Sequence, residues 1–271
     1  MKVRHDGQSG LALFAAELRA FRQKAGLSQE ELGAQLNFSP SLIAMVEGLR
    51  RAPTLQFAQR CDEALGTPGT FGRLQQFARK EALPAWFQPY ADIETAATQL
   101  RSWQPAFVDG LLQTEDYARA VLSGRPNTSH DDIEELVTAR MARQVILERS
   151  EPPVLWAVID EGALHRLVGS EKVMRDQLFH LAEMSLRPNI TVEVVPYSAG
   201  GHYALLGAFN IVESGDAARA GYLETVNEGY IVETPSIIAA MMLAFDTVRS
   251  ETLSRGASLD FIRNRAETAW T

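Results

Sequence analysis

The stretch SQEELGAQLNFSPSLIAMVE, residues 28–47, decides the fold of the N-terminal part of the chain. Ser28 can cap a first helix, because its hydroxyl can accept from the backbone N–H of Glu31 while the Glu31 carboxylate reaches back to the capping residue. Leu32 and Leu36 lie four residues apart and give this helix an apolar face. The pattern therefore predicts a short amphipathic helix that begins with a capping box.

A second helix start follows at Ser39, with Pro40 in the first turn, where a missing N–H costs nothing. Its inner face comprises Leu42, Ile43 and Val46, and its outer face comprises Ser41, Ala44 and Met45. Two capped helices joined by a four-residue turn can be an ordinary helical hairpin. They can also be a helix-turn-helix, in which the second helix lies in the major groove of DNA, and the flanking helices favour this interpretation.

Residues 12–66 resemble the DNA-binding domain of the Xre/Cro/lambda-repressor family. The resemblance rests on GLSQEEL (residues 26–32), on the Ile and Glu in the second half of the third helix, and on the basic residues directly after it. It implies an ion pair between Arg22 on the first helix and Glu47 on the third. It also implies that Gln29 contacts a phosphate or a base, and that Arg50 and Arg51 contact the DNA backbone.

The outer face of the third helix departs from this family. Many relatives read base edges with Gln, Arg or Asn, whereas this chain has short or apolar side chains there. Such side chains are poor bidentate partners for bases, so specificity must come more from DNA shape, thymine methyl groups or a second subunit. The predicted DNA-binding residues are Gln29, Ser39, Pro40, Ser41, Ala44, Met45, Arg50 and Arg51.

Charge is divided unevenly along the chain. Residues 1–80 hold 11 Lys and Arg against 7 Asp and Glu, a net charge of +4, which leaves −12 for residues 81–271 of the total of −8. A monomer would neutralise few phosphates, so binding to double-stranded DNA is expected to need a homodimer. The acidic remainder disfavours a membrane surface.

Length and cysteine content limit the number of domains and the kind of protein further. A chain of 271 residues with 46% hydrophobic content has room for the first module and one more domain. It has no run of 18 apolar residues and begins without the hydrophobic core of a signal peptide, so we expect a cytoplasmic protein without a membrane span. The single cysteine, Cys61, excludes an internal disulfide and is expected to be a buried, inert thiol.

The predicted organisation has three parts: a helix-turn-helix domain at residues 1–82, an aromatic-rich structured bridge at residues 83–126, and an α+β domain at residues 127–271. The first domain is predicted to have five helices, the fourth from the Thr54 cap to Leu65 and the fifth over residues 70–81. Residues 84–117 carry six aromatic side chains, so this segment must pack. Core packing explains most of them. The alternative is that Trp86, Trp103 and Phe107, with Tyr203 further on, line a ligand cavity.

Residues 127–271 mix helical and strand patterns. VLWAVID (154–160) and ITVEVVP (190–196) predict buried strands, and shorter ones are expected in GAFNIVE (207–213), GYLETV (221–226) and GYIVE (229–233). Helices are predicted over residues 131–149, 161–168, 172–186, 235–251 and 258–269. The order of these elements indicates an α+β fold.

A second resemblance covers this part. The strings GLLQTEDYARAVL (110–122), VIDEGALHRLVG (158–169) and PNITVEVVPYSAGGHYALLGAFNIVE (188–213) are similar to the C-terminal domain of unknown function in many actinobacterial Xre-type regulators. That resemblance implies a small partner protein encoded nearby and a link to development and specialised metabolism. It leaves the ligand of the domain open.

An enzyme in the second domain is the third alternative. Glu161 with His165, and His180 with Glu183, have helical spacings that metal ligands use, but such pairs are common in helical proteins and half-buried histidines explain them. The loop at residues 198–202 lacks the ending of a phosphate-binding loop, and a tight turn explains it. We therefore expect no enzyme, no metal and no cofactor.

The sequence thus predicts a sequence-specific, homodimeric transcription regulator whose C-terminal domain senses a small-molecule effector or binds a partner protein. The aromatic bridge, Trp103 in particular, is the expected route of the signal. The alternative is an antitoxin-like protein that binds a small partner protein and regulates its own gene. Which domain dimerises stays open at this point.

Overall fold

The structure is a computed structural model and describes residues 10–49, 53–82, 87–126, 128–215, 217–225 and 228–270. The chain forms two compact units. The first unit takes in Met1–Ala85 and Ser129–Ala142, and the second takes in Trp86–Thr128 and Arg143–Thr271.

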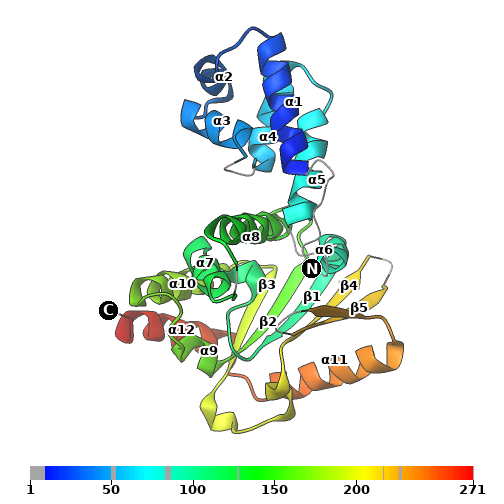
Figure 1. Ribbon diagram of the computed structural model, residues 1–271. Helices are drawn as coiled ribbons and strands as arrows, with labels where there is room; N and C mark the ends of the chain where they lie inside the picture. Colours follow the sequence, from blue (N-terminus) through cyan, green and yellow to red (C-terminus); the bar gives the residue numbers. More distant parts are fainter. Residues whose placement is uncertain are drawn as a thin grey trace. The chain divides into compact units, whose positions relative to one another are not determined.

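Five helices build the N-terminal part of the first unit, as the sequence predicts (Figure 1). They are α1 (Gly10–Lys24), α2 (Gln29–Leu36), α3 (Pro40–Glu47), α4 (Leu55–Leu65) and α5 (Thr70–Ala82). Their core is one apolar cluster in which Phe14, Leu32, Ile43 and Phe57 are buried almost completely. Cys61 belongs to the same cluster, and burial raises the pKa of its thiol, which keeps it protonated and inert.

The first unit also includes α8 (His130–Arg143) except for its last residue, which belongs to the second unit. The sequence predicts one helix over residues 131–149. In the structure the α-helix ends at Arg143, and a 3-10 turn, Gln144–Leu147, follows it. The predicted helix is therefore present, but its C-terminal part is a 3-10 helix rather than an α-helix.

A six-stranded mixed sheet organises the second unit, in the order β3-β2-β1-β4-β5-β6 (Figure 1). The strands are β1 (Ala97–Gln104), β2 (Val154–Asp160), β3 (Ile190–Val195), β4 (Phe209–Ser214), β5 (Arg219–Glu224) and β6 (Gly229–Val232). β1, β2 and β3 are parallel, while β4, β5 and β6 join by antiparallel pairing. The predicted strands β2 to β6 and the α+β class are confirmed.

The central strand β1 is the main departure from the sequence prediction. Residues 83–126 were expected to form a separate bridge. The structure places 97–104 between β2 and β4, so the described part of the expected bridge, residues 87–126, belongs to the second unit. The segment ATQLRSWQ has few β-branched residues and no clear alternation, so its strand conformation depends on pairing with β2 and β4 rather than on local preference.

Helices cover both faces of this sheet. The helices of the second unit are α6 (Gln88–Thr95), α7 (Glu115–Ser123), α9 (Glu161–His165), α10 (Glu171–Met184), α11 (Pro235–Arg249) and α12 (Arg255–Thr268). α11 packs on the face that carries Trp103, Phe209 and Ile211. Because side chains alternate along a strand, Asn210 points to the opposite face, where it donates to the hydroxyl of Tyr90 on α6.

A buried ion pair fixes α6. The Glu94 carboxylate accepts from Nε and Nη2 of Arg143, both at 2.8 Å, and Glu94 is only 2% exposed. The Arg143 guanidinium also lies over the Phe87 ring, 4.5 Å from its centroid. Each charge has a bidentate partner, as a buried charge requires.

The helices of the described residues are too short or too polar to span a membrane.

Candidate nucleic-acid interface

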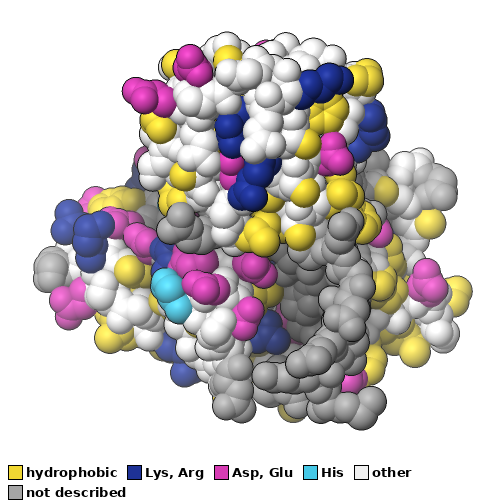
Figure 2. Space-filling view, turned by 45° about the horizontal axis from the view of Figure 1, so that its top comes forward, with side chains coloured by type: hydrophobic (Ala, Val, Ile, Leu, Met, Phe, Trp, Pro, Cys, Tyr) yellow, Lys and Arg dark blue, Asp and Glu magenta, His cyan; other side chains and the backbone are white. Residues whose placement is uncertain are grey.

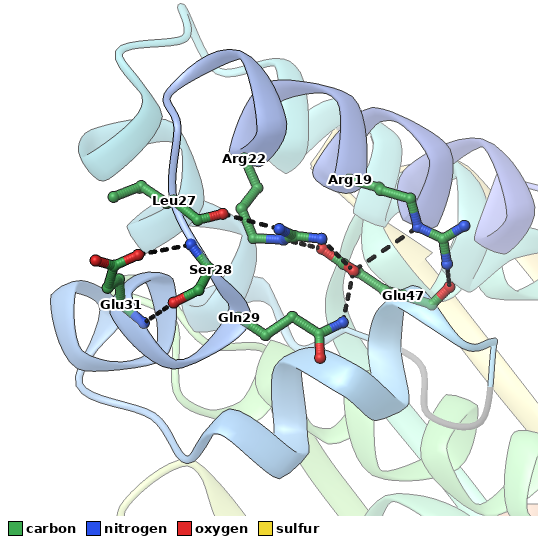
Figure 3. Close-up of polar contacts among 7 residues, drawn as sticks. All are labelled: Arg19, Arg22, Leu27, Ser28, Gln29, Glu31 and Glu47. Atoms are coloured by element: carbon green, nitrogen blue, oxygen red, sulfur yellow. Dashed lines mark hydrogen bonds and ion pairs between the residues drawn. The ribbon is translucent and has the colours of Figure 1, made fainter.

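The start of α2 has the geometry that its sequence predicts (Figure 3). The Glu31 N–H donates to the Ser28 hydroxyl at 3.1 Å, and the Ser28 N–H donates to the Glu31 carboxylate at 2.7 Å. The bond from the Ser28 backbone lowers the pKa of Glu31. The capping box therefore fixes the first residue of the helix-turn-helix.

The turn between α2 and α3 depends on a close backbone approach. Asn37 ends α2 in the left-handed conformation, with φ of 56°. A Cβ on Gly33 would lie 2.9 Å from the carbonyl oxygen of Phe38, closer than real contacts of this kind. At the other end of the turn, the Ser39 hydroxyl accepts from the Leu42 N–H at 3.2 Å and caps α3. Gly33 is a requirement that the sequence prediction missed.

A buried carboxylate ties α3 to α1 (Figure 3). Glu47 accepts from Arg22 Nε at 2.6 Å and from Arg22 Nη2 at 2.9 Å, which is the ion pair that the resemblance implies. Arg22 Nη1 also donates to the carbonyl of Leu27, at the entry to α2. The Arg19 guanidinium donates to the backbone carbonyl of Glu47 at 3.0 Å. Arg22 thus joins α1 to the end of α3 and to the segment that leads into α2.

Burial alone would raise the pKa of Glu47, but hydrogen bonds from Arg22 and Gln29 and the charges of Arg22 and Arg19 outweigh it, so the pKa is lowered. The Glu47 side chain is 1% exposed and that of Arg22 is 12% exposed. The pair is therefore shielded from solvent, and its attraction is screened much less than that of a surface pair.

Gln29 belongs to the same network. Its amide nitrogen donates to Glu47 Oε2 at 2.8 Å (Figure 3). The family resemblance assigns this residue a DNA contact, which stays a prediction. In the structure its nitrogen holds the first turn of α2 against the end of α3.

The outer face of α3 carries short side chains. Ser39, Pro40 and Ser41 are exposed, and Ala44 and Met45 are half-buried. The expected phosphate contacts Arg50 and Arg51 lie outside the described residues. Figure 2 shows Lys and Arg side chains interspersed with uncharged and acidic ones over the upper part of the surface in that view. The face can reach a DNA groove closely but offers few long donors to base edges.

The four aromatic residues predicted to line a ligand cavity have different surroundings. Trp103 is fully buried in the sheet core, where its Nε1 donates to the carbonyl of Ala204 at 2.7 Å. Tyr203, next to that carbonyl, is 83% exposed, and Phe107 is 40% exposed. Trp86 lies outside the described residues. Trp103 thus has a packing role, and ligand binding by these aromatics stays a prediction.

Of the residues whose spacing suits metal ligands, Glu161 and His165 lie together on α9. Glu161 Oε1 lies 3.1 Å from His165 Nε2, and its second oxygen accepts from the backbone N–H of Tyr197. Burial lowers the pKa of His180. Within the described ranges, no three or more His, Cys, Asp or Glu side chains are grouped so that they could hold a metal ion.

Comparison with known families matches both units. A helix-turn-helix domain model matches residues 13–70, and the model of a domain of unknown function, DUF5753, matches residues 87–264. No curated protein and no solved structure matches the chain. The helix-turn-helix match, with the geometry of α2 and α3, indicates a DNA-binding regulator. Because the second match spans more than half of the chain, this protein belongs to the DUF5753 family, and it carries a helix-turn-helix domain ahead of the family domain.

Proposed function

We propose that this protein is a sequence-specific transcription regulator that binds double-stranded DNA as a homodimer and acts in the cytoplasm. The second unit would sense a small-molecule effector or bind a small partner protein, and would not act as an enzyme. The observation that carries this proposal is the network around Glu47, because it fixes α3 against α1 and α2 while leaving Ser41 exposed.

Recognition by this face would rest on fit rather than on long polar side chains. Ser41 and Ala44 let the helix backbone come close to a base edge, and Ala44 and Met45 can contact a thymine methyl group. Two copies of α3 would read half-sites about 34 Å apart, one turn of the duplex. Each copy adds its own phosphate contacts. A second set is needed because residues 1–80 have a net charge of only +4 and one copy would neutralise few phosphates.

Binding to the promoter of its own gene tests the proposal. We would measure fluorescence anisotropy of the full chain on that duplex and on a scrambled duplex at two salt concentrations. Preference for the promoter, retained at the higher salt, supports the proposal. Equal and strongly salt-dependent binding to both duplexes contradicts it.

A pair of matched variants ties the preference to α3. Ala44→Glu places a carboxylate on the face that would meet the DNA, and should remove the preference. Ala64→Glu adds the same charge to the exposed surface of α4, outside the helix-turn-helix pair, and should keep it. A preference that survives Ala44→Glu would assign recognition to another surface.

The short side chains of α3 also favour a second candidate, an antitoxin-like protein that binds a small partner protein and regulates its own gene. Purification from the native cell separates the two. A stoichiometric partner protein supports the second candidate, whereas a retained small molecule supports effector sensing.

A further inference from the structure

The outward side of α11 is unusual for a surface helix. Its inner side packs on the sheet through Ile238, Met241, Phe245 and Val248. The outward stripe comprises Ser236, Ala240, Leu243 and Thr247, all exposed. Leu243 is 69% exposed. The spacings of four, three and four residues are those of a helix-packing seam.

This stripe carries no charge, although residues 81–271 have a net charge of −12. Among the 15 residues of α11, only Asp246 and Arg249 are charged. Arg249 is engaged elsewhere, because its Nε donates to Glu193 at 3.0 Å and its guanidinium lies over the Trp156 ring. A surface helix usually presents charged and polar residues to water. The stripe therefore suits contact with another uncharged protein surface.

We propose that this stripe is the dimer interface, in which α11 packs antiparallel against α11 of a second copy about a twofold axis between Ala240 and Leu243. The proposal rests on the proposed function, which requires a dimer, and names the surface that forms it. The stripe matches itself when reversed. Each Leu243 then faces the small Ala240 of the second copy, so that a large side chain packs against a small one, and each Ser236 faces Thr247.

Charge selects the antiparallel direction. In this register Asp246 lies opposite Ile237, beside the first turn of α11 in the second copy. The N-cap residue of α11, Thr234, makes no side-chain hydrogen bond to the helix. The positive end of the helix dipole is thus left without a capping side chain, and a carboxylate from the second copy would stabilise it. A parallel pair would instead bring the two Asp246 carboxylates together.

Exposed apolar side chains also lie on a turn that contacts α11. The 3-10 turn Tyr203–Leu206 packs against α11. It exposes Tyr203 by 83% and Leu206 by 78%. Exposed aromatic side chains such as Tyr203 are common in protein interfaces.

The molar mass of the full chain in solution tests the proposal, measured by light scattering over a dilution series. The wild type should have twice the chain mass of 29.9 kDa. Leu243→Glu should raise the dimer Kd by at least about 100-fold, because each copy would bury a carboxylate without a partner. Leu186→Glu, at a leucine 58% exposed outside α11, should leave the dimer intact. Circular dichroism would establish that both variants are folded.

Two results would overturn the proposal: a dimer that survives Leu243→Glu, or a wild-type chain that is monomeric alone and associates only with a different protein. Promoter binding is measured on the same samples. A dimer lost in Leu243→Glu, with no promoter preference in the wild type, would support this interface while contradicting the proposed function.

Discussion

At the scale of single residues, Glu47 holds the end of α3 against α1 and α2 through Arg22 and Gln29. Glu47→Ala would leave the Arg22 guanidinium, 12% exposed, without its carboxylate. We expect a loss of about 3 kcal/mol in the free energy of unfolding of the first unit. The tryptophans of the described residues, Trp103, Trp156 and Trp270, lie in the second unit. Tryptophan fluorescence therefore follows the second unit, while circular dichroism follows the helices of both units. In urea, the variant should shift an early transition seen by circular dichroism and leave the fluorescence transition unchanged.

The exposed glutamate Glu63 on α4 provides the control for that measurement. Glu63→Ala should leave both transitions in place. Equal shifts for the two variants would contradict a special role for Glu47.

The lowered pKa of Glu47 also gives the pH dependence a sign. Its folded-state pKa lies below the ordinary value of 4.5, so the ionised carboxylate stabilises the first unit at pH values above that value. This contribution is lost as the pH falls through the lowered folded-state pKa. Between neutral and acid pH, the circular dichroism midpoint in urea should therefore fall more steeply for the wild type than for Glu47→Gln. Parallel curves would contradict the assignment.

In the second unit, Trp103 is the residue whose substitution we expect to cost most stability. Trp103→Ala would leave a cavity in the sheet core and deprive the Ala204 carbonyl of its donor, at an expected cost of about 3–5 kcal/mol. Fluorescence of the remaining tryptophans in urea measures this loss. Trp103→Phe should cost less, since it retains much of the ring volume. The Phe variant is therefore the better test of signal transmission through this residue.

At the scale of elements, the distance between α2 and the turn before α3 depends on Gly33. Gly33→Ala would place a Cβ 2.9 Å from the backbone oxygen of Phe38, so the two segments would have to move apart. We expect a loss of about 1–3 kcal/mol in the stability of the first unit, together with weaker DNA binding. Gln35→Ala, at an exposed position of the same helix, is the control and should change neither. Urea unfolding and promoter anisotropy measure the two effects.

At the scale of the whole molecule, dimerisation should appear in the salt dependence of DNA binding. The logarithm of the binding constant falls with the logarithm of salt concentration in proportion to the number of phosphates contacted. The slope of this plot for the wild type on a duplex with two half-sites should be about twice the slope for Leu243→Glu on a duplex with one half-site. Equal slopes on the two duplexes would mean that one copy makes all the contacts.

Features that depend on near neighbours could be predicted from the amino-acid sequence alone. Ser28, Glu31, Ser39 and Pro40 define two helix starts through bonds that span three residues, and short, nearly continuous apolar runs mark β2 and β3. The pairing of Arg22 with Glu47 came from a family resemblance, because 25 residues separate them.

Contacts between distant segments arise from the folded structure as a whole. It made ATQLRSWQ a central strand, because β2 and β4 supply backbone partners that the segment cannot provide for itself. It turned the Gln29 amide toward Glu47, and it paired Glu94 with Arg143. It also left the stripe of α11 facing outward, since burial of the opposite side fixes the rotation of the helix. Local hydrogen bonding can be predicted from neighbouring residues, whereas burial and long-range pairing depend on the whole fold.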